Sequence, residues 1–508
     1  MKYGFVIDNR RCIGCHACTV ACKAEHDVPL GSFRTWVKNV EKGTFPDVRR
    51  YFTVLRCNHC DDAPCVTICP TGALFTRADG IVDFDNRQCI GCKACMAACP
   101  YDALYIDAAN STAAKCNYCA HKVEVGLQPA CVAVCPEQAI VAGDLEDPHS
   151  AISRLVATES TSVRKPEKGT LPKLYYIDGD SASLQPGAAP RLEAYAWAER
   201  PREDVDGDFP ILASPSAART VYDVAHAKPW GALVSLYLWT KSMAAGPILV
   251  SALLMLLGLA RAPVLFGAVA PVLALGFTAL TVLLLVADLE RPERFCKLLF
   301  HPNWRSWLVW GAWILIAFSG VVFLWLFGAL LGRGALLAAL LWPALLLAAL
   351  GAGYSAFLLA QARARDLWQS RLLFPHLVVQ AHLAGSALLG LASFYYDSGA
   401  ALTGLLLRNL LAALCVHGVF VVAEAALPHG THDASGAVAC MVSGPLARLF
   451  WFGAVFGGIA LPIHVLAYTF THPGTGLHIP ALAAALALAG LLAFEECFIR
   501  AGQALPLT

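Results

Sequence analysis

Residues 89–100 read CIGCKACMAACP, and this stretch decides how the amino-terminal part of the chain folds. Its four cysteines are spaced C-x2-C-x2-C-x3-C and a proline follows. The four-cysteine arrangement recurs three more times before residue 137, twice with the proline, and its middle gap widens to four residues in one group and eleven in another. The groups, in chain order, are Cys12, Cys15, Cys18 and Cys22; Cys57, Cys60, Cys65 and Cys69; Cys89, Cys92, Cys95 and Cys99; and Cys116, Cys119, Cys131 and Cys135. Sixteen of the 20 cysteines therefore belong to one repeated motif.

The spacing indicates cubane iron–sulfur clusters. Three closely spaced thiolates on a curling loop can reach three irons of one cluster, and the fourth cysteine reaches the neighbouring cluster. Structural zinc instead uses C-x2-C pairs separated by longer gaps. A disulfide framework is disfavoured because cysteines so close in sequence cannot all pair locally. The sequence therefore predicts four [4Fe–4S] clusters as cofactors on the sixteen cysteines, with Cys65 completing the second group.

Crossed ligation of this kind holds two clusters in one fold, so the four groups form two pairs. The second and third groups are contiguous, and residues 71–87 between them predict a short helix followed by a hairpin. The first and last groups then pair by elimination. We expect an α+β, ferredoxin-like soluble domain over residues 1–145. Residues 146–229 are rich in Pro, Ser, Ala and Gly and predict an extended tail and linker.

Basic residues stand beside several of the cysteines, for example Arg11, Arg56, Lys93 and Lys115. Through charge and hydrogen bonds they could tune the reduction potentials of the clusters. Solvated surface charge is the simpler interpretation, and the sequence alone favours it.

The second half of the chain is different in character. The whole chain is 57% hydrophobic and only 15% charged, which is too apolar for a wholly soluble protein. After Gly231, apolar runs long enough to cross about 30 Å of hydrocarbon recur. The predicted spans are residues 232–260, 264–287, 307–331, 335–360, 375–396, 402–426, 446–470 and 480–500. Residues 230–508 are therefore expected to form an all-α polytopic membrane domain of about eight transmembrane helices.

Lysines and arginines in the connections predict the orientation of these spans. If the amino-terminal domain is cytoplasmic, eleven basic residues lie inside and three lie outside, namely Arg261, Arg333 and Arg408. The amino terminus shows no apolar stretch that a secretory signal needs. We therefore expect a multi-pass protein of the inner (cytoplasmic) membrane with the iron–sulfur domain on the cytoplasmic side. A net charge of +1 without a basic, aromatic-interleaved stripe predicts no nucleic acid partner.

Polar residues inside the spans are costly in lipid and are candidates for function. Four such residues lie near the predicted cytoplasmic ends of the spans: Tyr237, Asp288, His376 and Glu424. A fifth, Lys241, lies deeper in the membrane. An electron carrier that meets the clusters from within the bilayer is a quinone, which needs hydrogen-bond donors and a proton source. We predict these five as quinone-binding residues. The alternative is that each only hydrogen-bonds one helix to another.

Two further interpretations stay open at this point. A haem b could be held by histidines from different spans, with candidates His376, His382, His417 and His464, although no span carries the paired histidines of a two-haem cytochrome. An ion-translocating redox module could use the ionisable residues Lys241, Asp288, Glu424, Glu495 and Glu496.

With these motifs in view, the chain resembles the complex iron–sulfur molybdoenzyme family, as a fusion of two subunits. Residues 1 to about 200 resemble the four-cluster subunit of the dimethyl-sulfoxide- and polysulfide-reductase type, and all sixteen cysteine positions match. The remainder is similar to the NrfD-type polysulfide-reductase anchor, a haem-free eight-helix quinone subunit. The matching segments are residues 237–246 (YLWTKSMAAG), 288–292 (DLERP), 301–302 (HP), 310–313 (WGAW) and 500–507 (RAGQALPL).

The resemblance implies a separate catalytic subunit that carries a molybdenum or tungsten pterin cofactor (molybdopterin type). It further implies that the chain is a non-catalytic electron-transfer and anchor subunit with quinone oxidoreductase activity. Its clusters then conduct electrons between that subunit and the membrane quinone pool.

Overall fold

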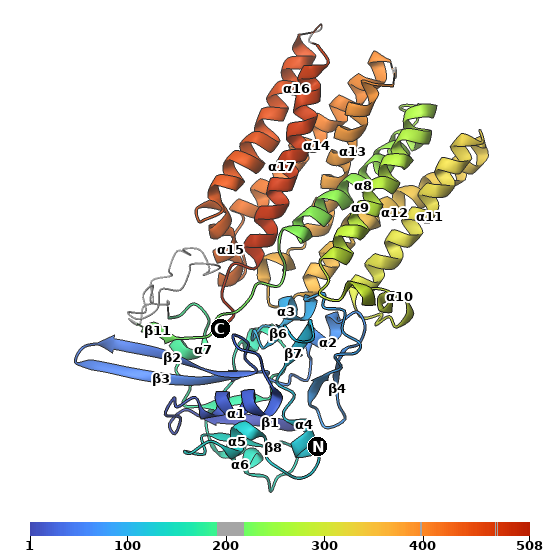
Figure 1. Ribbon diagram of the computed structural model, residues 1–508. Helices are drawn as coiled ribbons and strands as arrows, with labels where there is room; N and C mark the ends of the chain where they lie inside the picture. The colour runs from blue at the N-terminus through green and yellow to red at the C-terminus, as the bar shows by residue number, and fades with distance from the viewer. Residues whose placement is uncertain (190–217, 397–398, 473, 475) are drawn as a thin grey trace.

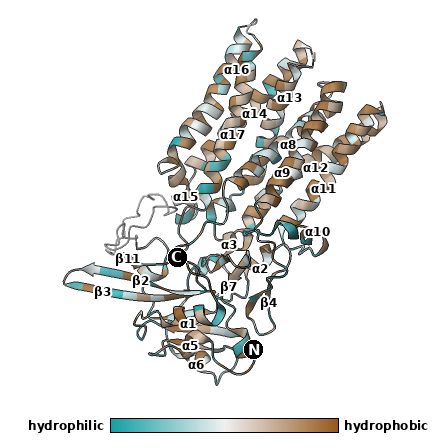
Figure 2. Ribbon diagram, viewed as in Figure 1, coloured by the Kyte–Doolittle hydropathy of each residue, from teal (hydrophilic) through white to brown (hydrophobic). Residues whose placement is uncertain are grey.

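The computed structural model describes residues 1–189, 218–396, 399–472, 474 and 476–508. The chain forms two parts, a compact region of strands and short helices at the amino-terminal end and a bundle of long helices (Figure 1). The bundle is strongly hydrophobic along its length, whereas the first part mixes polar and apolar residues (Figure 2). The carboxyl terminus returns to the junction between the two parts.

Eight helices of the bundle are long and apolar enough to cross a membrane, as predicted. They are α8 (Ala232–Leu256), α9 (Ala270–Ala287) preceded by the π-helical turn η2 (Leu265–Val269), α11 (Trp307–Leu330), α12 (Gly334–Gln361), α13 (Leu373–Ser393), α14 (Ala400–Ala426), α16 (Leu461–Thr471) preceded by the π-helical η5 (Leu449–Ala460), and α17 (His478–Gly502). On the junction side lie η3 (Pro292–Arg294), α10 (Lys297–Phe300), η4 (Asp366–Gln369) and α15 (His432–Val442).

Helix α8 is the centre of the bundle, because 83% of its spanning window is buried and it packs on α9, α12, α13 and α17. Its contact with α13 is very close: a Cβ on Gly246 would come within 2.2 Å of the carbonyl oxygen of Ala381. Gly385 faces Gly246 across the same contact. Small residues are what allow two helix backbones to approach in a membrane. The polar residues of α8 are therefore held inside protein rather than against lipid.

The first part contains the four-stranded sheet β8-β1-β10-β9 and the three-stranded sheet β11-β2-β3. Their strands are β1 (Tyr3–Asp8), β2 (Thr35–Thr44), β3 (Asp47–Arg56), β8 (Ile140–Asp144), β9 (Thr161–Ser162), β10 (Leu174–Ile177) and β11 (Ala218–Tyr222). Two small hairpins pair β4 (Leu74–Thr76) with β5 (Val82–Phe84) and β6 (Leu104–Asp107) with β7 (Thr112–Lys115). The short helices are α1 (Ala17–His26), α2 (Pro64–Ile68), α3 (Ala94–Ala98), α4 (Ala120–Val123), α5 (Ala130–Ala133), α6 (Ala151–Thr158), η1 (Pro166–Lys168) and α7 (Ser181–Leu184).

Strand β10 extends the cluster-binding domain past the boundary expected at residue 145. It pairs in parallel with β1, opposite Phe5 to Asp8, and so lies inside the main sheet. Leu174 and Tyr176 are fully buried there, which explains why a segment otherwise rich in small residues is ordered. Part of the expected linker, residues 190–217, lies outside the described residues.

The segment between the second and third cysteine groups differs from the expectation in one detail. The predicted hairpin is present as β4 and β5, but residues 71–87 contain no helix. The helix lies earlier, at α2, with Pro64 in its first turn. Proline at that position needs no amide hydrogen, so it starts the helix before the last cysteine of the group rather than after it.

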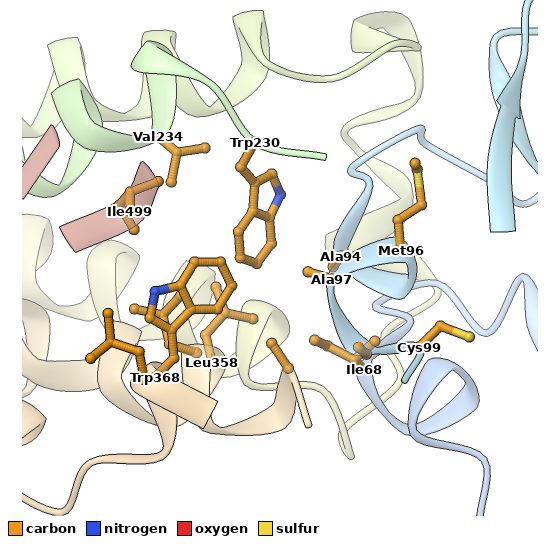
Figure 3. Packing of buried hydrophobic residues seen from close by; sticks show 14 of the residues in the cluster. Ile68, Ala94, Met96, Ala97, Cys99, Trp230, Val234, Leu358, Trp368 and Ile499 are labelled. Atoms are coloured by element: carbon orange, nitrogen blue, oxygen red, sulfur yellow. The ribbon is translucent and has the colours of Figure 1, made fainter. Parts of the chain in front are cut away.

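The two parts share one hydrophobic core. Ile68, Ala94 and Ala97 of the cluster domain face Trp230, Trp368 and Ile499 of the bundle (Figure 3). Hydrogen bonds reinforce this contact: the side chain of Asn303 donates to the carbonyl oxygen of Cys69 at 2.7 Å, and Ser306 donates to that of Ile68 at 2.6 Å. The cluster domain is thus packed directly on one end of the membrane helices.

Candidate electron-transfer site

The structure brings the sixteen cysteines together in four sets of four. Site 1 contains Cys12, Cys15, Cys18 and Cys135; site 2 contains Cys22, Cys116, Cys119 and Cys131; site 3 contains Cys57, Cys60, Cys65 and Cys99; and site 4 contains Cys69, Cys89, Cys92 and Cys95. Each set takes three cysteines from one sequence group and the fourth from another. This is the crossed arrangement that the spacing predicts.

The thiols fit cubane clusters better than single ions. Among the described residues, no three Cys, His, Asp or Glu side chains converge closely enough to hold one metal ion. The thiols are instead spread around hollows such as the one lined by Cys69, Cys89, Cys92 and Cys95. Backbone amides point at some of the sulfurs, since Gly91 and Ala113 each donate to the Cys89 sulfur at 3.4 Å. Such hydrogen bonds stabilise thiolates that hold a cluster.

The four sites form a line from the surface to the membrane domain. Cys15 of site 1 is exposed, whereas site 4 lies at the junction with the bundle. Thiols of neighbouring sites interact electrostatically in the pairs Cys18 with Cys131, Cys116 with Cys57, and Cys95 with Cys65. The order is therefore 1, 2, 3, 4. Figure 1 shows the same sequence, with α1 and α5 far from the bundle and α2 and α3 against it.

Site 4 touches the membrane domain through its backbone. The amide of Glu290, just after α9, donates to the carbonyl oxygen of Gly91 at 3.2 Å, and Arg291 donates likewise to Ile90. Gly91 has a φ of +70°, and a Cβ there would lie 2.5 Å from the side chain of Glu290. Only glycine suits both the backbone conformation and the close contact.

Three of the four basic residues beside the cysteines are not solvated surface charges, which corrects the simpler interpretation. Arg56 and Lys115 are fully buried. Lys115 donates to the carbonyl oxygens of Val82 and of Cys116, the latter at 2.8 Å. Lys93 reaches across the junction to carboxylates of the bundle. Arg11 is exposed, as expected. Burial depends on tertiary packing, which the spacing of charges along the chain does not report.

A cavity of about 500 Å³ opens at the junction beside site 4. Its walls combine residues of both parts, among them Lys93, Met96 and Tyr105 of the cluster domain and Leu233 and Asp288 of the bundle. The Lys93 ammonium lies 3.4 Å from the Asp288 carboxylate and 3.3 Å from that of Glu290. Burial raises the pKa of Asp288 above its ordinary value, against the opposing effect of Lys93. The cavity has a size typical of small-molecule sites and carries a few convergent polar groups.

Of the five predicted quinone residues, Asp288 lines this cavity, whereas Tyr237 does not and has its hydroxyl within hydrogen-bonding reach of Ser355. Tyr237 follows Leu233 by one turn on the same face of α8 and is within electrostatic reach of Asp288. Lys241 lies one turn deeper, where its ammonium donates to Ser355 of α12 at 2.6 Å and sits 4.8 Å from the Tyr354 ring centroid.

Lys241, Tyr354 and Ser355 form a buried polar cluster. Tyr354 and Ser355 were not among the candidate functional residues predicted from the sequence. Their only signal in the sequence is a polar interruption of a long apolar run. Glu495 of α17, fully buried, also faces Lys241, and one of its oxygens finds no partner among the described residues. The cluster therefore joins three helices around one lysine.

His376 and Glu424 lie elsewhere, between α13, α14 and α17. The Nε2 atom of His376 is 2.9 Å from Nδ1 of His417, so one ring nitrogen donates to the other. Both rings pack against Phe494. Glu424 is buried near the junction end of α14. These residues do not line the cavity beside site 4.

The histidine pair does not suit haem ligation. Metal-bound imidazole nitrogens lie about 2 Å from the metal, so two that ligate one iron from opposite faces are about 4 Å apart. At 2.9 Å the His376 and His417 nitrogens leave no space for an iron between them. The pair is a buried hydrogen bond between helices.

Known proteins resemble both parts of the chain. Residues 220–506 match the family described as polysulphide reductase, NrfD. The protein belongs to the NrfD family. Residues 11–74 and 48–145 each match 4Fe-4S dicluster domains. The family resemblance and the two-part fold class expected from the sequence are thereby confirmed.

Relatives of this NrfD-family protein match its cluster domain. One subunit of tetrathionate reductase from Salmonella typhimurium is 43% identical over 202 residues, which cover 39% of this chain and 80% of the relative. One component of polysulfide reductase from Wolinella succinogenes is 39% identical over 189 residues, 36% of this chain and 98% of the relative. The arsenate respiratory reductase iron-sulfur subunit ArrB of a Shewanella species is 36% identical over 225 residues, 35% and 96% respectively. These relatives are subunits of reductases, and here their counterpart is fused to an NrfD-type membrane domain.

Proposed function

We propose that the chain is the electron-transfer and membrane-anchor subunit of a quinone-linked reductase, in which four [4Fe–4S] clusters connect a separate molybdopterin-type catalytic subunit to the quinone pool. The observation that carries the proposal is the line of four cysteine sites that starts at the exposed Cys15 and ends beside a cavity at the membrane junction. When bound, the clusters supply one-electron carriers along this line.

The partner is proposed to dock where site 1 reaches the surface. Ile13 and Val20, on either side of the Cys15 loop, are exposed apolar residues with 55% and 65% of their surface accessible. Exposed apolar groups around a redox site suit contact with another protein. The relatives are reductase subunits, which supports a partner that performs the substrate chemistry.

The quinone headgroup is proposed to bind in the cavity beside site 4. Reduction of a quinone takes two electrons and two protons, so its site needs a donor at a carbonyl oxygen and a source of protons. The Lys93 ammonium can donate, and Asp288, whose pKa is raised, can hold and release a proton. Tyr237 lies on the membrane side of Lys93 and Asp288, and we include it among the proposed contacts with the quinone.

The other three predicted residues, Lys241, His376 and Glu424, are not proposed to contact the quinone headgroup. Lys241 supports Tyr237 from one turn deeper. His376 and Glu424 do not line the cavity and are proposed to exchange protons at a distance from the headgroup. Each of them also serves to join helices, in the way that the hydrogen bond between His376 and His417 joins α13 and α14.

We propose that the cluster domain faces the cytoplasm, across the inner membrane. Of the eleven basic residues expected inside, five bind the cluster domain and therefore have a second reason to be there: Arg219, Arg291, Arg294, Lys297 and Arg363. Without those five the bias is six against three in the same direction.

A second candidate function is a redox-driven ion-translocating module. The observation that favours it is the fully buried cluster of Lys241, Ser355 and Glu495, which lies deeper in the membrane domain than the cavity. Buried ionisable groups are costly and mark ion or proton pathways in membrane proteins.

One experiment separates the two candidates. The complex is purified from native membranes, its largest partner is identified by mass spectrometry, and its quinol-linked turnover is measured in vesicles with a pH-sensitive dye. A pterin-containing partner, with no proton movement beyond the two protons per quinone that the reaction itself exchanges, supports the first function. Proton movement in excess of those two protons, without such a partner, supports the second.

A further inference from the structure

Arg56 is placed differently from Arg11, Lys93 and Lys115. It ends β3 directly before Cys57 of site 3, yet its guanidinium turns to site 2. Nη1 donates to the sulfur of Cys131 at 3.0 Å, and the guanidinium carbon lies 4.5 Å from the Phe5 ring centroid. The remaining cysteines of site 2, namely Cys22, Cys116 and Cys119, all lie within its electrostatic reach.

Among the described residues, no carboxylate forms an ion pair with the guanidinium. Arg56 is fully buried, and its Nε and Nη2 atoms have no hydrogen-bond partner among the described residues. Its largest electrostatic interactions are with the thiols Cys131, Cys116 and Cys18. A buried cation without a counter-ion is strongly unfavourable. A negatively charged unit held by the site 2 thiolates would therefore be its counter-ion.

We propose that Arg56 raises the reduction potential of the cluster held at site 2. A [4Fe–4S] cluster with four thiolates is anionic, and its reduced form carries one more negative charge than its oxidised form. A fixed positive charge in a dry interior stabilises the reduced form more than the oxidised one, and net charge and hydrogen bonds to sulfur set cluster potentials. The proposal rests on the proposed four-cluster function and assigns Arg56 a positioning and tuning role within it.

The other three basic residues give the contrast that isolates this role. Arg11 also stands directly before the first cysteine of a group, but it is exposed and screened by water. The Lys115 ammonium is held by two carbonyl oxygens. Lys93 is paired with Asp288 and Glu290. Of these four residues, Arg56 alone donates to a ligand sulfur.

The test is a redox titration of the full-length, cluster-loaded protein followed by electron paramagnetic resonance. Arg56→Gln keeps a polar side chain of similar reach but removes the charge. We expect the midpoint of the site 2 cluster to move furthest to a more negative potential, with a smaller negative shift at site 1, because Cys18 of site 1 also lies within electrostatic reach of the guanidinium, and none at site 4. A Cys119→Ser variant, which perturbs site 2, identifies the signal that should move. Arg11→Gln is the matched control and should shift no midpoint.

Iron and acid-labile sulfide analysis keeps this test separate from the four-cluster proposal. If the parental protein binds fewer than four clusters, the proposed function fails, whatever Arg56 does. If Arg56→Gln carries all four clusters and every midpoint equals the parental value, the role of Arg56 is refuted.

If Arg56→Gln does not load the site 2 cluster, its midpoint cannot be measured, and the Arg56→Lys variant tests the proposal instead. The lysine variant keeps the positive charge, so it should load all four clusters with the site 2 midpoint close to the parental one. A clear negative shift in spite of the retained charge contradicts the proposal.

Discussion

Lys93 of the third cysteine motif and Asp288 at the end of α9 form an ion pair across the junction between the cluster domain and the membrane domain, with 3.4 Å between Nζ and Oδ1. Lys93 stands directly between Cys92 and the helix that carries Cys95. Asp288 lines a cavity that opens beside the same site. One ion pair therefore connects the last cysteine site to the cavity that we propose as the quinone site.

We expect Asp288→Asn to lower quinone-linked turnover by between about 10-fold and 100-fold, because the amide cannot supply a proton. All clusters should stay reducible by dithionite, since the substitution leaves the cysteine sites intact. Glu293→Gln, an exposed carboxylate five residues away, is the control and should turn over at the parental rate. An Asp288→Asn variant with parental turnover and apparent affinity for quinone would place the headgroup elsewhere.

Tyr237→Phe tests whether the Tyr237 hydroxyl contributes to quinone binding. Removal of the phenol hydroxyl should weaken the apparent affinity for quinone several-fold, because one proposed hydrogen bond to the headgroup is lost. Tyr468→Phe is the control: the same atom is removed from a tyrosine of α16 that lies outside the cavity lining. Quinol kinetics on membranes measure both. Equal effects of the two variants would assign Tyr237 to helix packing.

A third expectation concerns Lys165, which is buried against the junction with its ammonium unpartnered in the described structure. Burial lowers the pKa of Lys165 to about 7, only partly opposed by Asp433, from an ordinary value of 10.5. Between these pH values the unfolded protein binds a proton that the folded protein does not, so the free energy of unfolding rises with pH. Below about pH 7 the cost of the buried charge is fully present.

Lys165→Met should therefore stabilise the protein at pH 7 and below, by about 1–3 kcal/mol. The gain should shrink as the pH rises from about 7 toward 10.5. Thermal unfolding of the detergent-solubilised protein at several pH values measures this. The exposed Arg49→Met, in the β2–β3 hairpin, provides a control whose effect should not depend on pH. A gain that is constant across the range contradicts the low pKa of Lys165.

The cysteine sites could be predicted because cluster binding constrains the spacing of cysteines within one short segment. A cubane needs three thiolates within a short loop, so the spacing survives in the sequence. The eight spans were predictable for a similar reason, since each must be apolar over a membrane thickness. In both cases the constraint acts on neighbouring residues of one segment.

Features that depend on packing between distant segments impose no such local constraint. The main sheet gains β10 from residues 174–177, whose partner β1 begins at Tyr3. The buried cluster around Lys241 takes Ser355 from another span. Arg56 and Arg11 each stand directly before the first cysteine of a group. Only the fold makes Arg56 buried and Arg11 exposed.

The basic residues near the span ends show how one pattern can have two causes. Arg291 donates to the carbonyl oxygen of Asn110 at 2.8 Å, and Arg294 to that of Cys89 at 3.0 Å. These contacts hold the cluster domain on the bundle and need positive charge on whichever side that domain lies. A count of lysines and arginines therefore reports docking as well as orientation.

A fourth prediction concerns the number of clusters. Sixteen cysteines in four complete sets should hold about 16 irons per chain. In Cys65→Ser, site 3 loses one thiolate, so the iron content should fall to between about 12 and 15, with a three-iron paramagnetic signal where the cluster survives in part. Cys415→Ser removes a cysteine outside the four sets and should change nothing. If Cys65→Ser kept the parental iron content and spectra, the assignment of site 3 would be wrong.

The last prediction addresses the side of the membrane on which the cluster domain lies. The carboxyl terminus is a poor place for a reporter, because Thr508 is buried at the junction and hydrogen-bonds to Asp223. Two exposed positions on opposite ends of the bundle serve better. Cys296, beside η3, lies at the junction end, and Arg333, between α11 and α12, lies at the far end.

Labelling of intact cells with a membrane-impermeant maleimide then reads the orientation directly. In a variant with Cys296→Ser and Arg333→Cys, the new cysteine should react from outside, because the proposed orientation puts the far end of the bundle in the periplasm. In the parental protein Cys296 should react only after the cells are permeabilised. The exposed Cys415 lies within α14 and so within the bilayer, where an impermeant reagent does not reach it. Labelling of Cys296 in intact cells, with Arg333→Cys protected, would reverse the orientation. The cluster domain and its partner would then lie outside the cytoplasm, and the basic residues near the span ends would be explained by docking alone.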